Sequence, residues 1–179
     1  MRRDILLLSF LGSVILSICG VVHFWNPKLQ TLSQVYGNHN HKIYFFFLVN
    51  LFGMVCALAY EYTFKDLNSF FLFSILAVTY ILILWISEDI GDSLRHKSHV
   101  VLSGISFTFA LLYILYHAVF RRDPLLYMFF IVSLGLFYRI VYRTVNAYQT
   151  GSSVTEMILE ELTMLVLFVM TVVRRGGYI

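Results

Sequence analysis

Long apolar runs separated by short polar segments make up most of the chain. Each run spans about 17–22 residues, the length that a helix needs to cross the hydrocarbon of a bilayer. The runs cover residues 5–25, 43–62, 69–86, 99–120, 125–142 and 154–173. This pattern predicts an all-α fold, an integral membrane bundle of six transmembrane helices, which forms a single domain over residues 1–179.

Composition agrees with this prediction and excludes other classes of protein. Of the 179 residues, 59% are hydrophobic and only 13% are charged, against roughly 25% charged residues in soluble domains. Too few polar residues remain to cover the outside of a soluble fold. The lysines and arginines form no basic patch with interleaved aromatic residues, so nucleic acid is not an expected partner.

Three arginine doublets indicate the orientation in the membrane. They precede the first run, separate the fourth from the fifth, and follow the sixth: Arg2-Arg3, Arg121-Arg122 and Arg174-Arg175. If all the runs cross the membrane, the three doublets lie on one side. Cytoplasmic ends of membrane helices carry an excess of Lys and Arg, so both termini are expected in the cytoplasm.

The longest polar interruption, residues 84–99, then lies at the non-cytoplasmic face with segments 26–42 and 143–153. That face receives most of the histidines and many of the acids: His23, His39, His41, His96, His99, Glu88, Asp89, Asp92, Glu156 and Glu160. Because charge within a membrane is costly and is usually paired or functional, the sequence predicts a polar, lipid-binding pocket there. Its predicted members are His99, Asp89, Asp92, Arg139, Arg143, Glu156 and Glu160.

Two ion pairs are predicted between the fifth and sixth runs. In an antiparallel hairpin, Arg143 lies level with Glu156 and Arg139 lies level with Glu160, because each pair is equally far from the turn. The pairs repeat at i,i+4 and therefore line one helix face. Three interpretations stay open: a hairpin staple without chemistry, a site for an anionic lipid headgroup, or a carboxylate with a catalytic role.

Histidine pairs raise the question of a metal site. His39 and His41, or His96 and His99, could present two imidazoles to one zinc ion. No motif of known ligand spacing, such as HExxH, accompanies them. Interfacial histidines that meet water and headgroups are the simpler interpretation, so neither a metal nor a cofactor is expected.

Two predictions concern packing between the helices. Asn50, inside the second run, is predicted to form an interhelical hydrogen bond. Gly104, with Ser103 and Ser106 in the fourth run, is predicted to allow close helix approach, because small residues let helix backbones come together in membranes.

Segment 31–62, TLSQVYGNHNHKIYFFFLVNLFGMVCALAYEY, resembles the first outer loop and second helix of the FRAG/DRAM/Sfk family of six-span membrane proteins. That family has a serine-acid-x-x-glycine loop, then a phenylalanine-rich helix start with asparagine and glycine inside it. The residues that fit are Ser33, Gly37, Phe46, Asn50 and Gly53. Gln34 stands where the family usually has aspartate.

A second stretch, from Glu88 through Arg121, is similar to the same family. His99 fits the family's histidine at the opening of the fourth helix, and the basic doublet fits the end of that helix. A glutamate early in the family's sixth helix corresponds to Glu160 or Glu161. The order and lengths of the six apolar runs agree with the family along most of the chain.

The resemblance implies lipid-related work, without a catalytic mechanism that can be carried over. One branch of the family remodels the lipid of glycosylphosphatidylinositol anchors in the Golgi. Another assists recruitment of a phosphoinositide kinase at the plasma membrane, and a third resides in lysosomes and affects autophagy. The implied location is therefore an endomembrane, of Golgi or lysosome, or the plasma membrane.

Three functions remain open at this point. The first is a lipid-handling protein whose polar pocket grips a headgroup at the non-cytoplasmic face, with membrane lipids as its partners. The second is a non-catalytic accessory or scaffold subunit, whose partners are other transmembrane subunits. The third is an integral-membrane lipid hydrolase with a histidine-carboxylate metal site. Whether the protein is an enzyme stays open.

Overall fold

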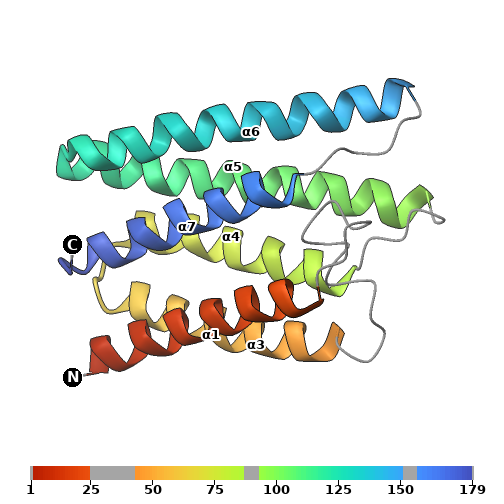
Figure 1. Cartoon of the computed structure of the whole chain (residues 1–179). Coiled ribbons are helices and arrows are strands. Elements are labelled where there is room, and N and C mark those ends of the chain that lie inside the picture. Colours follow the sequence, from red (N-terminus) through yellow and green to blue (C-terminus); the bar gives the residue numbers. More distant parts are fainter. Residues whose placement is uncertain (1, 25–42, 87–92, 151–156, 179) are drawn as a thin grey trace. The chain divides into compact units, whose positions relative to one another are not determined.

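The structure, a computed structural model, describes residues 2–24, 43–86, 93–150 and 157–178 (Figure 1). These residues form six α-helices, joined by turns where the connection is described, and contain no strand. The helices are α1 (Arg2–Phe24), α3 (Ile43–Tyr62), α4 (Leu67–Trp85), α5 (Ser93–Arg121), α6 (Pro124–Thr150) and α7 (Ile158–Arg175).

The prediction of an all-α fold is confirmed for these residues. Five helices, α1, α3, α4, α5 and α6, are long and apolar enough to cross a membrane. This is the architecture of a multi-pass membrane protein. α7 is not among the five, because it carries two acids in its first turn and two arginines in its last turn. A sixth crossing, and the single domain, stay predictions.

Two helices extend beyond the predicted apolar runs by six residues or more. α5 begins at Ser93 rather than at residue 99, and α6 continues to Thr150 rather than ending at residue 142. Segment 143–153 was expected to be a link, and most of it is helical. Hydropathy predicts only the apolar part of a helix, the part that can lie in the hydrocarbon. The helix itself can continue through polar residues, because its backbone hydrogen bonds do not depend on hydropathy and neither Pro nor Gly interrupts them here.

The chain divides into two compact units, which are described separately. The first comprises Met1–Asn26 and Ser33–Ala110, and therefore α1, α3, α4 and the first part of α5. The second comprises Pro27–Leu32 and Leu111–Ile179, and therefore the last part of α5 with α6 and α7.

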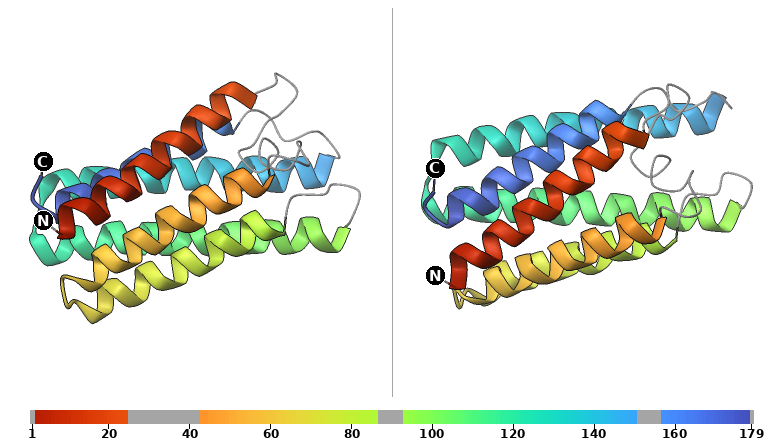
Figure 2. Two further views of the ribbon diagram at one scale, coloured as in Figure 1. Left: turned by 90° about the horizontal axis from the view of Figure 1, so that it is seen from below. Right: turned by 60° about the horizontal axis from the view of Figure 1, so that its bottom comes forward.

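Small residues bring α1 and α3 together in the first unit, where the two helices lie side by side in all views (Figures 1 and 2). Ser13, Ser17 and Gly20 form a buried stripe on α1. A Cβ added at Gly53 of α3 would lie 1.9 Å from Ser13 Oγ and 2.8 Å from Ser13 Cβ. Only glycine fits there, because any side chain would overlap Ser13. Small residues at such contacts let membrane helices pack closely, and close packing is what drives their association.

Asn50 connects three helices of the first unit, as predicted. Its side-chain nitrogen donates to Ser17 Oγ of α1 at 2.9 Å and to the Phe46 carbonyl at 2.7 Å, while its oxygen accepts from Tyr80 Oη of α4 at 3.0 Å. The prediction for Gly104 is wrong: a Cβ there would meet no atom within 4 Å, so this glycine marks no close approach in the described structure.

Charged residues collect where α1 begins and α3 turns into α4. Arg3 donates to the Thr63 carbonyl at 2.7 Å, and its guanidinium lies 4.8 Å from the centroid of the Phe64 ring. Lys65 takes a left-handed conformation (φ 55°) in the turn, and Asp66 then caps α4 by accepting from Ser69 N at 3.1 Å. The N-terminus of α1 is thereby tied to this turn.

The second unit is packed around a cluster from α5 and α6. Its fully buried members are Ile114, Ala118, Leu126 and Phe129, and the partly buried Leu167 of α7 contacts it. Tyr113 and Phe168 bring their rings to 5.4 Å, centroid to centroid, which joins α5 to α7.

Replacing Gly53 by alanine tests the close contact between α1 and α3. Because the added methyl group would overlap Ser13, the Gly53→Ala change is expected to lower the free energy of unfolding by about 1–3 kcal/mol. The matched control is Gly12→Ala in α1, where a Cβ meets nothing within 4 Å. The control is expected to be neutral, or to stabilise by up to about 1 kcal/mol. Equal stability of the two variants in detergent micelles would show that the contact is not tight.

Replacing Asn50 by leucine tests the polar connection among α1, α3 and α4. Hydrogen bonds between membrane helices contribute roughly 0.6 kcal/mol each on average. Loss of the bonds to Ser17 and Tyr80 is therefore expected to lower the free energy of unfolding by about 1 kcal/mol. Tyr80→Phe, which removes one of the two, should lose about half as much. A fully stable Asn50→Leu variant would contradict this role.

Candidate polar site between α6 and α7

The charged residues of α7 lie in its first and last turns, and each end is paired with another part of the second unit. At the first turn, Glu160 meets two arginines of α6. At the last turn, Arg174 meets Asp123, which lies between α5 and α6. The pairings define an antiparallel α6–α7 pair, since Asp123 precedes α6 and Arg174 ends α7.

Glu160 Oε1 is shared by two guanidinium groups. Arg139 Nη2 lies 3.0 Å from it and Arg143 Nη1 lies 3.3 Å from it. The predicted Arg139–Glu160 ion pair is therefore confirmed. Arg143 binds the same oxygen, and its predicted partner Glu156 lies outside the described residues. Arginines four residues apart on α6 are neighbours on one face, so both reach the start of α7.

The start of α7 carries backbone N–H donors close to Glu160 in the chain. Its N-cap residue, Met157, makes no side-chain capping hydrogen bond. The first N–H groups of a helix have no intrahelical acceptor, and the helix dipole places partial positive charge there. Glu160 in the first turn interacts favourably with that charge.

Arg139, Arg143 and Glu160 form a cluster whose most exposed member is Arg139. Its side chain is 59% exposed, whereas that of Glu160 is only 10% exposed. Glu161 follows Glu160 in the first turn of α7, so two arginines and two carboxylates stand at this helix end. A guanidinium offers five N–H donors, and Arg139 uses one nitrogen in its ion pair. Arg139 therefore presents unused N–H donors outward.

The cluster lies far along α6 from Pro124, the first residue of that helix. Arg139 follows Pro124 by 15 residues, which corresponds to about 22 Å at 1.5 Å per residue. Arg143 lies about 28 Å along the helix by the same measure. The hydrocarbon of a bilayer is about 30 Å thick. A membrane-crossing α6 that enters near Pro124 would thus carry the cluster at the level where the opposite headgroups begin.

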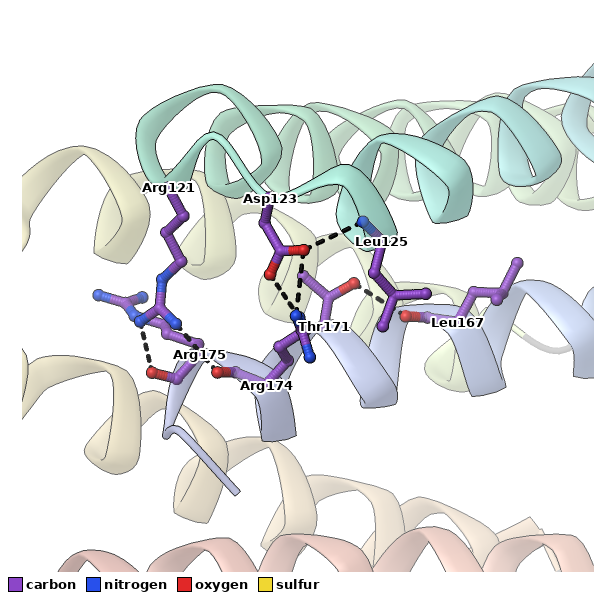
Figure 3. A network of polar contacts seen from close by, with 7 residues as sticks. All are labelled: Arg121, Asp123, Leu125, Leu167, Thr171, Arg174 and Arg175. Atoms are coloured by element: carbon purple, nitrogen blue, oxygen red, sulfur yellow. Dashed lines mark hydrogen bonds and ion pairs between the residues drawn. The ribbon is translucent and has the colours of Figure 1, made fainter. Parts of the chain in front are cut away.

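At the other end of α7, a second network joins α5, α6 and α7 (Figure 3). Arg174 donates through Nε and Nη2 to the two oxygens of Asp123, with Nη2 at 3.1 Å from Oδ1. Asp123 also accepts from Leu125 N at 3.0 Å, in the first turn of α6. Arg121, the last residue of α5, donates to the carbonyls of Arg174 and Arg175. The Arg174 carbonyl also accepts from Gly177 N at 3.0 Å, so Arg121 adds a further donor at this end of α7.

The pKa of the Asp123 carboxyl is lowered from its ordinary value, chiefly by the hydrogen bond from Arg174, against the opposing effect of burial. Sequence reasoning used the arginine doublets for orientation only and missed this network. One signal was available: an aspartate directly before a proline is typical of a helix start, and two arginines ended the last run.

The remaining members of the predicted pocket are not brought into this cluster by any described contact. His99 lies in the part of α5 that belongs to the first unit and is 5% exposed. Asp89, Asp92 and Glu156 lie outside the described residues. Among the described residues, no group of three or more His, Cys, Asp or Glu is arranged to hold a metal ion. The pocket as a whole stays a prediction.

Comparison of the chain with protein-family models, with curated proteins and with solved structures found no match. The length and composition of five helices define the class of the protein, a helical, multi-pass membrane protein.

The Asp123–Arg174 ion pair gives a pH dependence of known sign. Because the pKa of Asp123 is lowered in the folded state, the pair stabilises the fold above the ordinary value of 3.8. That stabilisation is lost as the pH falls through the lower, folded-state pKa. Asp123→Asn keeps the capping of α6, since asparagine is a good N-cap, and removes the charge.

The stability difference between wild type and Asp123→Asn is thus expected to stay constant from pH 7 to pH 5 and to shrink below pH 4. Thermal unfolding in detergent across this range measures it. A difference that grows on acidification would contradict the lowered pKa.

Proposed function

We propose that this protein is a lipid-handling membrane protein, which holds the phosphate of a lipid headgroup at the cluster of Arg139, Arg143 and Glu160. The observation that carries the proposal is the sharing of one carboxylate oxygen by two arginines, one of them 59% exposed. The exposed guanidinium of Arg139 keeps N–H donors that its ion pair with Glu160 does not use.

The chemistry of the cluster suits phosphate. The planar guanidinium matches two phosphate oxygens at once, which is why arginine is enriched at phosphate sites. A helix N-terminus favours an anion for the reasons given above. The length of α6 would place these donors at headgroup level, where phosphate groups of lipids are concentrated.

The distribution of charge supports an orientation with both termini in the cytoplasm. Basic residues gather at the start of α1 and the α3–α4 turn in one unit, and at the α5–α6 turn and the end of α7 in the other. If α4 and α5 both cross, the two turns lie on the same side. The positive-inside rule then assigns that side to the cytoplasm, and the cluster to the non-cytoplasmic face.

A sixth crossing by α7 is compatible with its charges. Glu160 and Arg174 are both paired, and residues 162–173 between the charged ends carry no charge. Paired charges near the ends of a membrane helix are far less costly than isolated ones at its centre.

The resemblance of segments 31–62 and 88–121 to the FRAG/DRAM/Sfk family supports the same proposal, because its branches work on or near lipids. It also motivates the proposed location in an endomembrane, of Golgi or lysosome, or in the plasma membrane. In the competing proposal, an accessory subunit, the cluster is only a staple between α6 and α7.

Arg139→Gln separates the two proposals. Hydrogen bonds to charged groups contribute about 1.5–3 kcal/mol, so loss of Arg139 is expected to weaken phospholipid binding at least tenfold. Native mass spectrometry of the purified, delipidated protein with added phospholipid measures this binding. The matched control is Arg122→Gln, an exposed arginine of the α5–α6 turn.

The control is expected to bind this lipid as the wild type does. Unchanged lipid binding in Arg139→Gln, with helix content intact by circular dichroism, would favour the accessory subunit and reject the headgroup site.

A further inference from the structure

The two oxygens of Glu160 have different surroundings. Oε1 forms ion pairs with both arginines, whereas Oε2 is buried and has no hydrogen-bond partner among the described residues. Glu160 as a whole is 8% exposed. A buried acceptor without a donor is unfavourable, and more so when it is charged. The cluster therefore has one carboxylate oxygen that lacks a donor, on the same residue that pairs with the exposed Arg139.

A ligand that satisfies both demands carries a phosphate and an N–H or O–H donor close together. We propose that the cluster selects a headgroup in which a primary ammonium follows the phosphate, as in ethanolamine phosphate. This inference rests on the proposed function. The phosphate binds Arg139 and Arg143, and the ammonium donates to Glu160 Oε2.

Charge and size favour the primary ammonium over other headgroup donors. An ammonium brings three N–H donors and a full positive charge to the carboxylate, whereas a neutral hydroxyl brings one donor and no net charge. The trimethylammonium of choline has the same charge but no N–H donor, and its methyl groups are too bulky for a buried carboxylate oxygen.

The test uses a series of lipids with equal charge and a decreasing number of N–H donors. Phosphatidylethanolamine has three, its N,N-dimethyl derivative has one, and phosphatidylcholine has none. Binding to the full-length protein is measured by native mass spectrometry. The wild type is expected to bind phosphatidylethanolamine at least tenfold more tightly than phosphatidylcholine, with the dimethyl lipid between them.

Two variants assign this preference to Glu160. Glu160→Gln is expected to reduce the preference to less than about threefold. The matched control Glu161→Gln, with the same loss of charge one residue along α7, is expected to keep it. Helix content by circular dichroism confirms that both variants fold. The lipid series on the wild type tests the inference even if Glu160→Gln does not fold.

Equal binding of the three lipids to the wild type would overturn the selection of ammonium and leave the phosphate site standing. So would a preference that survives in Glu160→Gln, or tighter binding of phosphatidylglycerol, which offers hydroxyl donors. Absence of saturable binding by any phospholipid would instead reject the proposed function itself.

The same two groups also occur in soluble O-phosphoethanolamine. Competition against bound phosphatidylethanolamine separates the two sources. Much weaker competition by the soluble compound than by the lipid supports a lipid ligand, whereas equal or stronger competition overturns that assignment.

Discussion

Hydrocarbon does not solvate charge, and this constraint accounts for the positions of the described ion pairs. In the second unit, the charged residues of α7 stand in its first and last turns, with the uncharged residues 162–173 between them. Glu160 is held by two arginines, and Arg174 by Asp123. Both pairings lie at the ends of α7, and charge near the end of a membrane helix costs less than charge at its centre. The helices can therefore remain apolar along the parts that would face lipid.

The first unit meets the same constraint with neutral groups. Asn50 lies in the middle of α3, where an unpaired amide would be unfavourable, and its hydrogen bonds reach α1 and α4. Next to it along α3, Gly53 lets α1 approach until Ser13 is in contact. Close packing and short hydrogen bonds reinforce each other here, because the approach of the backbones brings the small polar side chains within reach.

The two ends of α7 differ in how fully their polar groups are satisfied. Asp123 and Arg174 match one acid with one base, and Arg121 donates to the last carbonyls of α7. Around Glu160, by contrast, two arginines meet one carboxylate oxygen, and the other oxygen has no donor among the described residues. In the proposed function, a zwitterionic headgroup would supply that donor.

Sequence alone determined the helical class, the approximate positions of six apolar runs, the hydrogen-bonding role of Asn50 and the pairing of Arg139 with Glu160. These follow from chain-local rules: hydropathy over a helix length, the isolation of a polar residue in an apolar run, and equal distances from a turn. The tertiary structure decided the sharing of Glu160 Oε1 by Arg143, the fit at Gly53, the open surroundings of Gly104 and the network around Asp123. Each of these depends on how helices rotate about their axes and how closely they approach, and apolar runs without strong periodicity do not specify that rotation.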